Sequence, residues 1–215
     1  MRIDIIFDTI CPWCYIGKRR LDQALKARPH VTVEKRWRPF LLNPDLPIDG
    51  IERRSYLVQK FGSEGRIERM LGAISQVGQS VEIDFAFDRI ERTANSIESH
   101  RLVRFADRSG KAEACVEALF LSYFVNGHDI GRPDLLLDIG IRLGLDRAAL
   151  ETHLASDDGK AEIIEENRRV HGMGVTGVPT FVFAGEYAIA GAQDPTVLTR
   201  LIDAAAANPE VATTS

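Results

Sequence analysis

The feature that most constrains the fold of this chain is a pair of cysteines placed where a strand gives way to a helix. Residues Arg2 to Phe7 have the sequence "RIDIIF", an isoleucine-rich run typical of a buried strand. The stretch "CPWCYIGKRRLDQAL", residues 11–25, has apolar residues at helical spacing, and Pro29 follows its end. A second strand is predicted over Val31 to Trp37, where "VTVEKRW" alternates apolar and polar residues. A strand–helix–strand unit of this kind joins two parallel strands by a right-handed crossover.

The centre of the chain, residues 51–172, has helical periodicity. Ser63 is a plausible N-cap for a helix whose apolar face includes Ile67, Ile74 and Val77. Pro133 and Asp146 occupy positions that favour the starts of two more helices. These two helices are predicted within 132–145 and 146–155, further ones are predicted within 93–110, 112–127 and 157–172, and "FAFD", residues 85–88, is ambiguous.

Strand character returns near the C-terminus. Thr180 to Phe183 and Tyr187 to Ala190 are separated by "AGE", which is the spacing of a hairpin. A last helix begins with Asp194 as N-cap and Pro195 in its first turn. The order βαβ, helices, ββα predicts one α/β unit made of two halves, residues 1–44 and 157–208. A helical insertion over 45–156 separates the halves, and 209–215 form a tail.

Composition excludes several classes of function. The chain has 215 residues, 45% of them hydrophobic, and a net charge of −4, which argues against a general nucleic-acid binder. "GKRR", residues 17–20, is its densest basic run and is interpreted as mostly a solvated helix face. No apolar run is long enough to cross a bilayer, and the first residues lack the features of a signal peptide. We therefore expect a cytoplasmic protein, whose three cysteines do not form a structural disulfide framework.

The position of the cysteine pair favours redox chemistry. A thiol attacks as thiolate, and a helix N-terminus lowers the pKa of a cysteine from about 8.5 to as little as ~3.5. This placement favours Cys11 as a solvent-accessible nucleophile and Cys14, one turn later, as a covered resolving thiol. A zinc site needs two more ligands, and neither Cys115 nor the five histidines have the paired spacing that zinc sites show. No metal is expected, and Cys115 is predicted to belong to the core.

A second motif, "GVTGVPTFVF", places Pro179 directly before a strand. A proline in this place ends a loop or caps an edge strand. It is equally compatible with a cis bond that holds a loop beside the thiols. The residues alone leave both interpretations open.

The motifs and their order resemble the DsbA-like branch of the thioredoxin superfamily. Within it, "FDTICPWCYIGKRRL", "FLLNP", "TANSIESHRL" and "GVTGVPTFVF" are most similar to the FrnE-type group of cytoplasmic thiol oxidoreductases. The resemblance covers nearly the whole chain. It implies a thioredoxin fold with a helical insertion, Cys11 as nucleophile and Cys14 as resolving thiol. It further implies a cis Pro179, with Val178 offering backbone hydrogen bonds to an extended thiol substrate.

Other residues are candidates for substrate contact. Pro12 and Trp13 flank the thiols, and Trp13 adds an apolar surface beside them. Asn43 either approaches a glutathione-like ligand or makes an Asx-type turn before Pro44. Gln193 and Asp194 lie at a helix start, which attracts charged groups, although capping alone explains Asp194. For His100 we favour a structural role with one hydrogen bond over a place in the cleft between the two parts of the molecule.

The sequence therefore predicts a thiol-disulfide oxidoreductase that acts on protein or small-molecule thiols and disulfides. It needs no cofactor, and glutathione is a possible co-substrate. The resemblance extends to 2-hydroxychromene-2-carboxylate isomerases and kappa-class glutathione transferases, which typically have Ser at the position of Cys11. A glutathione-dependent isomerase or transferase is thus the alternative, and a peptide-binding module with a vestigial thiol pair is a third class.

Overall fold

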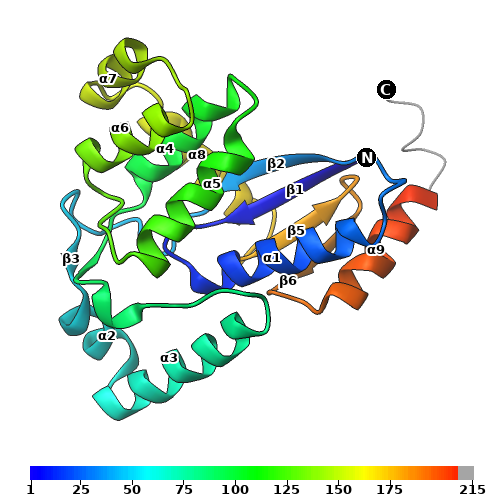
Figure 1. Cartoon of the computed structure of the whole chain (residues 1–215), viewed down its shortest axis with the longest axis horizontal. Coiled ribbons are helices and arrows are strands. Elements are labelled where there is room, and N and C mark those ends of the chain that lie inside the picture. The colour runs from blue at the N-terminus through cyan, green and yellow to red at the C-terminus, as the bar shows by residue number, and fades with distance from the viewer. Residues whose placement is uncertain (208–215) are drawn as a thin grey trace.

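A four-stranded mixed sheet lies at the centre of the molecule (Figure 1). The computed structural model describes residues 1–207. Strands β1 and β2 are parallel, from the pair Arg2–Glu34 to the pair Phe7–Pro39, while β5 pairs antiparallel with both β1 and β6. The order across the sheet is β2-β1-β5-β6, formed by β1 (Arg2–Phe7), β2 (Glu34–Pro39), β5 (Thr180–Phe183) and β6 (Tyr187–Ala190).

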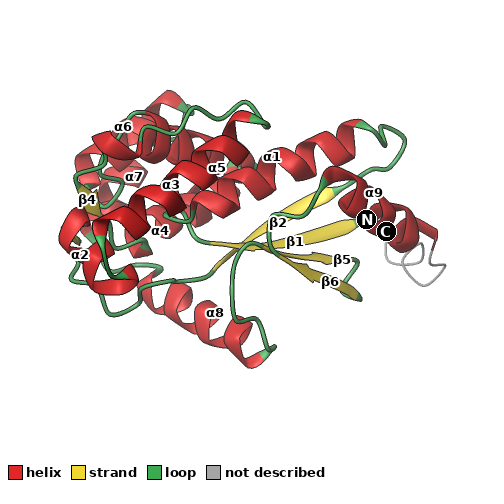
Figure 2. Cartoon of the chain, turned by 90° about the horizontal axis from the view of Figure 1, so that it is seen from below, coloured by secondary structure: helices red, strands yellow, loops and turns green. Residues whose placement is uncertain are grey.

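Two helices cover one face of this sheet. Helix α1 (Pro12–Lys26) packs against α9 (Pro195–Ala207), and α9 also contacts β5. Helix α8 (Lys160–Gly172) contacts β2 and lies on the opposite side of the sheet in Figure 2. The sheet is therefore enclosed by helices on both faces, as the predicted thioredoxin fold requires.

The helical region lies at one end of the sheet (Figures 1 and 2). A two-stranded ribbon joins the first residues of the helical region to its middle. It is formed by β3 (Ile51–Glu52) and β4 (Arg92–Thr93). The helices are α2 (Arg53–Phe61), α3 (Glu64–Gln79), the 3₁₀ turn η1 (Phe87–Arg89), α4 (Ile97–Asp107), α5 (Ala112–Phe120), the π-helical η2 (Leu121–Val125), α6 (Pro133–Arg142) and α7 (Arg147–Ala155).

The helix starts are confirmed in most places. The Asp146 side chain accepts a hydrogen bond of 2.7 Å from the backbone N–H of Ala149, and Pro133 occupies the first turn of α6. Asp194 caps α9 through an Oδ1 that accepts the backbone N–H of Thr196 at 2.9 Å. Ser63 is the N-cap residue of α3, but its side chain makes no capping hydrogen bond.

Other local predictions needed correction. The second strand lies at Glu34–Pro39, shifted toward the C-terminus from the predicted Val31 to Trp37. The reason is register, because β1 begins to pair only at Arg2, whose partner is Glu34. Helix α2 and the two-residue strands β3 and β4 had no counterpart in the sequence prediction, since elements this short carry little periodicity.

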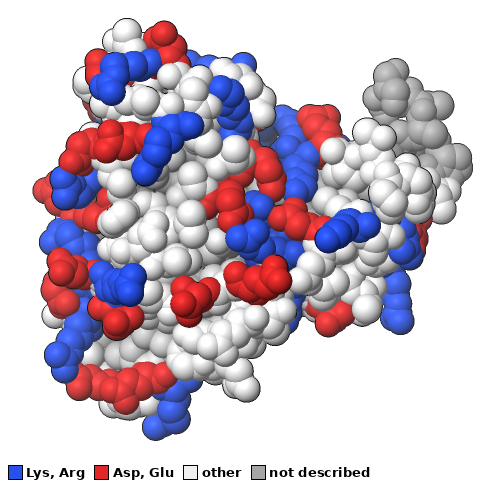
Figure 3. Space-filling model, viewed as in Figure 1, with Lys and Arg blue, Asp and Glu red and all other residues white. Residues whose placement is uncertain are grey.

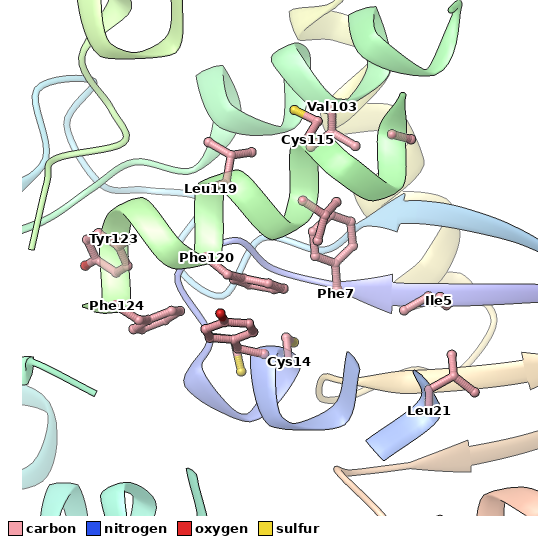
Figure 4. Close-up of a cluster of buried hydrophobic side chains, with 14 of the residues drawn as sticks. Ile5, Phe7, Cys14, Leu21, Val103, Cys115, Leu119, Phe120, Tyr123 and Phe124 are labelled. Atoms are coloured by element: carbon pink, nitrogen blue, oxygen red, sulfur yellow. The ribbon is translucent and has the colours of Figure 1, made fainter. Parts of the chain in front are cut away.

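One hydrophobic core runs from the sheet into the helical region. In Figure 4, Phe7 of β1 faces Phe120 of α5, with ring centroids 6.2 Å apart, and Phe124 continues the cluster. Tyr15 of α1 stacks on Phe120 at 5.0 Å, so aromatic rings join the two parts of the molecule. The boundaries predicted near residues 44 and 156 lie in connecting segments and stay predictions, and the tail at 209–215 lies outside the described residues.

The basic run at residues 17–20 is not the solvated face that its composition indicated. Only 5% of the Lys18 side chain is exposed, and its Nζ lies 2.8 Å from Glu113 and 3.0 Å from Glu117 of α5. Asp22, 2.9 Å away on α1, and Lys35 of β2 complete this cluster. Figure 3 shows acidic and basic side chains side by side where α1 meets α5. This seam cluster ties the helical region to the sheet unit.

None of the helices within residues 1–207 has the length and apolar character needed to span a membrane.

Candidate active site

The two cysteines lie at the start of α1, directly after β1. Cys11 is the N-cap residue, with extended backbone angles of φ −96° and ψ 113°, and Pro12 occupies the first helical position. The backbone N–H of Cys11 donates to Asp8 O at 3.1 Å, and that of Cys14 donates to Cys11 O at 3.0 Å. These hydrogen bonds close the backbone into a tight turn, so both cysteines lie within a single helical turn. Both are free cysteines.

Both thiols are buried, which corrects the expected solvent access of Cys11. Cys11 is 4% exposed and Cys14 is 2% exposed. Burial raises the pKa of the Cys14 thiol well above its usual range, and the neighbouring Cys11 side chain raises it further. Cys14 is therefore held as a neutral thiol, the state expected of a resolving cysteine before it reacts.

The second motif meets the first. The Val178–Pro179 peptide bond is cis, and the Cys11 thiol donates to Val178 O at 3.7 Å. Gly17 on α1 makes this approach possible, because a Cβ there would lie only 2.8 Å from Pro179 Cγ. Of the two interpretations of Pro179, the structure selects the one in which its loop lies against the thiols.

The residues expected beside the thiols differ in exposure. The Trp13 residue is 39% exposed, whereas Pro12 is partly buried. Leu42, in the loop after β2, is 36% exposed, and its backbone N–H donates to Asp8 at 2.7 Å. Trp13 and Leu42 thus expose apolar surface on two segments that both adjoin the turn from Asp8 to Cys14. Such a surface is suited to an apolar part of a substrate.

Asn43 follows Leu42, and its side chain does not form the Asx-type turn; its predicted contact with a glutathione-like ligand stays a prediction. Its Oδ1 accepts from the Tyr56 hydroxyl and from Lys60 Nζ, the latter at 2.9 Å. The turn comes from the backbone, where Leu46 N–H donates to Asn43 O. Lys60 is a candidate for contact with a substrate. Sequence analysis missed it because it lies on α2, a helix that was not predicted.

Gln193 and Asp194 lie at the other border of the site. Gly191 N–H donates to Pro179 O at 2.7 Å, which places this loop next to the cis proline. Gln193 Nε2 donates to Ala190 O at 2.7 Å, so its amide group holds the loop. Asp194 is exposed, and its carboxylate is engaged in capping α9. The geometry supports a structural role for both, and their predicted contact with substrate stays a prediction.

Asp8 was not recognised as part of the site, and His100 was considered for it but assigned a structural role. Asp8 is fully buried and lies three residues before Cys11, and His100 Nε2 lies 3.5 Å from its Oδ1. His100 also lines a cavity between α4, α8 and β2, so it has the cleft position that sequence analysis had ranked second. An acidic residue at the end of an apolar strand was the available signal for Asp8.

Cys115 lies apart from the pair. It is fully buried in α5 and lies beside Val103 in Figure 4, on the far side of Phe120 from Cys14. Burial raises the pKa of its thiol, which keeps it unreactive. Within residues 1–207, no three His, Cys, Asp or Glu side chains are grouped as metal ligands.

Comparison with solved structures supports the fold. The probable DsbA oxidoreductase SCO1869 of Streptomyces coelicolor is similar over 95% of this chain and 89% of its own, with 28% identity and a TM-score of 0.88. A 2-hydroxychromene-2-carboxylate isomerase covers 95% and 94%, with 18% identity and a TM-score of 0.69. The cytosolic disulfide reductase DsbM of Pseudomonas aeruginosa, solved also with GSH, covers 95% and 98%, with 17% identity and a TM-score of 0.64.

The family itself follows from the sequence as a whole. The DSBA-like thioredoxin domain matches residues 2–203, which include both cysteines, the cis proline and the helical region. The order of these motifs along the chain predicts the same assignment. This chain belongs to the family of DSBA-like thioredoxin domain proteins.

Proposed function

We propose that this protein is a thiol-disulfide oxidoreductase that exchanges disulfides through Cys11 and Cys14. One observation carries the proposal: the Cys11 thiol lies between a helix start and the carbonyl of Val178, 3.7 Å away, with the neutral Cys14 thiol behind it. A substrate sulfur that approaches along the Val178–Pro179 loop meets the Cys11 thiol before the Cys14 thiol, although Cys11 itself is only 4% exposed. The membership in a family that consists mostly of oxidoreductases supports the same conclusion.

The chemistry needs only the two thiols. The Cys11 thiolate attacks one sulfur of a substrate disulfide, and the other substrate sulfur leaves as a thiolate. Cys14 then loses its proton and attacks Cys11, which releases the second substrate thiolate and leaves a Cys11–Cys14 disulfide. Two electrons pass from the enzyme to the substrate, and the reverse sequence oxidises a dithiol. No further cofactor is required, because the cysteines carry both electrons.

The proposed substrates are thiols and disulfides of proteins or small molecules. Glutathione is a proposed co-substrate, supported by the structure of DsbM with GSH. Lys60 Nζ, beside Asn43, supplies a positive charge that suits a carboxylate of such a ligand. The cytoplasm is the proposed site of action, supported by the cytosolic DsbM.

Reduction of insulin by a dithiol tests the proposal. The Cys11→Ser variant is expected to lose all activity, because neither Cys14, whose pKa is raised, nor the distant Cys115 replaces the nucleophile. The Cys14→Ser variant is expected to accumulate a mixed disulfide on Cys11, detectable by mass spectrometry. Cys115→Ser serves as the matched control and retains activity. An active Cys11→Ser variant, or trapping on Cys115, contradicts the proposal.

The likeness to 2-hydroxychromene-2-carboxylate isomerase supports one alternative function. A glutathione-dependent isomerase needs a group that orients the glutathione thiolate, and it does not need a second cysteine. Wild-type protein that isomerises a chromene carboxylate with glutathione, yet neither reduces insulin nor oxidises a dithiol peptide, establishes the alternative. Activity in both dithiol assays with no isomerisation excludes it.

A further inference from the structure

A groove lined by apolar side chains runs between α2, α3 and the segment around η1. Its volume is about 740 Å³, within the range of ~300–1,000 Å³ that binding pockets occupy. Helices α2 and α3 contact each other and lie side by side in Figure 1. The apolar lining consists of Leu57, Ile67 and Ile90, which are buried, and of Leu71 and Phe87, which are partly exposed. Such a lining favours an occupant with apolar side chains.

The charged residues of this groove are mostly acidic. They are Glu52, Glu64, Glu68, Asp88 and Glu91, against the two basic residues Arg53 and Arg54. Both arginines are already engaged, since Arg54 Nε donates to Glu64 at 2.9 Å and Arg53 Nη1 donates to the hydroxyl of the buried Tyr123 at 3.2 Å. Glu52 accepts two backbone N–H groups as the cap of α2. Three acidic residues therefore remain for a partner.

These three carboxylates belong to Glu68, Asp88 and Glu91. The residues are exposed, and within residues 1–207 none of their side chains makes a hydrogen bond or an ion pair. They come from α3, from η1 and from the position before β4, and they do not form a metal site, because the described part of the chain groups no three such ligands. Separate carboxylates beside an apolar lining are complementary to a polypeptide segment in which Lys or Arg accompany apolar residues.

The groove is joined to the thiol pair by packed side chains. The Phe87 ring stacks on Phe85 at 4.8 Å, and Phe85 meets Tyr15 edge to face at 6.2 Å. Tyr15 directly follows the second cysteine on α1. Helix α2 is tied to the loop after β2, because Lys60 Nζ donates to Asn43 Oδ1 at 2.9 Å. In Figure 1, α2 and α3 lie at the end of the sheet where α1 begins, so a single polypeptide chain is able to contact both sites.

We propose that this groove binds a basic and apolar segment of protein substrates, while a cysteine of the same polypeptide reacts at Cys11. The inference rests on the proposed exchange function and narrows its substrates to proteins with such a segment. Binding in the groove raises the local concentration of the substrate sulfur at the thiol pair, because the attack by Cys11 then takes place within one complex. Small disulfides do not occupy the groove, so their reaction does not depend on it.

Binding is measured first, with two fluorescent peptides that contain no cysteine. Both combine Leu with a charged residue, which is Lys in one peptide and Glu in the other, and fluorescence anisotropy gives the affinity of each. An exposed ion pair contributes up to about fivefold in affinity, so with three pairs we expect the Lys peptide to bind at least about tenfold more tightly at low ionic strength. The preference is expected to shrink in high salt, because exposed charges are screened.

Removal of the three carboxylates is expected to abolish this preference. The groove variant combines Glu68→Gln, Asp88→Asn and Glu91→Gln, all at exposed positions. Its affinity for the Lys peptide is expected to fall at least about tenfold, while the Glu peptide binds no more weakly than before. Leu71→Gln changes the partly exposed lining instead and is expected to weaken the binding of both peptides. Circular dichroism checks the fold of each variant.

A matched control separates the groove from the overall charge of the protein. The control variant combines Glu34→Gln, Asp138→Asn and Glu162→Gln, which lie on β2, α6 and α8. These residues are exposed, and their side chains are unpaired within residues 1–207, as the groove carboxylates are. Both variants thus lose the carboxylates of two glutamates and one aspartate. The control variant is expected to bind the Lys peptide as wild type does.

Exchange is measured next, with peptide disulfides. Each peptide carries an added cysteine, placed at the end of Gly-Ser linkers of several lengths and bonded to an aromatic thiol that absorbs visible light when released. The Cys11 thiolate forms a bond to the peptide sulfur, the bond between the peptide and aromatic sulfurs breaks, and the aromatic thiolate leaves. Wild type and the control variant are expected to react at least about tenfold faster with the Lys peptide, and the groove variant to react with both peptides alike. An aromatic disulfide without a peptide is expected to react equally with all three proteins.

Several results overturn the inference. Equal affinity of wild type for the two peptides would mean that charge does not select the occupant, and equal weakening of the control variant would mean that overall charge acts. Exchange rates that do not follow the binding preference would separate the groove from the thiols. Dimers of wild type in analytical ultracentrifugation that the groove variant does not form would assign the groove to a second copy. Failure of the proposed exchange function looks different, because wild type would then release no thiolate from the aromatic disulfide, whereas the anisotropy would be unchanged.

Discussion

Replacing Lys18 by Met tests how the two parts of the molecule are held together. Lys18 lies in α1 with 5% of its side chain exposed, and its Nζ is 2.8–3.0 Å from three carboxylates, those of Asp22, Glu113 and Glu117. Met has a similar length but no charge. The Lys18→Met variant therefore leaves the three carboxylates facing one another across the seam between α1 and α5. Lys35 still pairs with Asp22 and Glu113, and Arg19 still pairs with Glu117.

The loss of stability follows from these exposures. Removal of one partner from a buried ion pair costs about 3–5 kcal/mol. The three carboxylate side chains keep 29–40% of their surface exposed, so water compensates part of the loss. We therefore expect the free energy of unfolding to fall by about 3 kcal/mol, the low end of that range. At about 2–4 °C per kcal/mol for a chain of this size, Tm falls by about 6–12 °C.

The pH dependence has a definite sign. Burial by itself would lower the pKa of Lys18, but Glu113 and Asp22 outweigh burial and raise it. The contribution of Lys18 is therefore complete below its unfolded pKa of about 10.4, and it is lost as pH rises through the higher folded pKa. For Asp22, burial favours a higher pKa, but Lys18 and Lys35 lower it overall. Its contribution is present above an unfolded pKa of about 3.9 and is lost as pH falls through the lower folded pKa.

Equilibrium urea unfolding, followed by far-UV circular dichroism, measures the difference. The difference in the free energy of unfolding between wild type and Lys18→Met is expected to stay constant through the neutral pH range and to become smaller at acidic pH. Arg147→Met is the control, because Arg147 forms an exposed pair with Glu151 at 3.1 Å, and such pairs contribute about 0–1 kcal/mol. A Lys18→Met loss no larger than that of the control refutes the reasoning.

Three further predictions concern single side chains. Iodoacetamide is expected to label Cys11 before Cys14 near neutral pH, since burial raises the pKa of Cys14, and mass-spectrometric mapping that finds Cys14 labelled first contradicts the assigned roles. Cys115, fully buried, is expected to resist labelling in the native state, and Cys115→Ala to keep exchange activity at a cost of about 1 kcal/mol; a large loss of activity without unfolding would make it a redox participant. Asp146→Ala removes the cap of α7 and is expected to lower the free energy of unfolding by about 1 kcal/mol in urea titration, whereas no change would mean that the cap is redundant.

The sequence by itself determined the features whose causes lie within one or two turns of chain. The helix starts at Asp146 and Asp194 depend on side chains that reach only two or three residues ahead, and such signals survive in any fold. The β5–β6 hairpin follows from its short connection, and the start of α1 follows from Cys11 and Pro12. Because the two redox motifs stand in a recognisable order, the family could also be predicted before any contact was known.

Tertiary structure decided which of these residues meet. Lys18 contacts carboxylates almost one hundred residues away, so a run that is basic in sequence is neutralised and buried in space. Cys11 loses its expected exposure because the Val178–Pro179 loop, 167 residues further along, closes over it. The register of β2 similarly depends on where its partner β1 begins.

The pair Asp8–His100 shows the physical reason most clearly. Each residue has an ordinary local environment, one at the end of a strand and the other on an amphipathic helix. Their partnership arises only when α4 packs against the turn after β1, an arrangement fixed by the long-range core of Phe7 and Phe120. Local propensity acts over a few residues, whereas burial and electrostatic pairing depend on the whole packed chain.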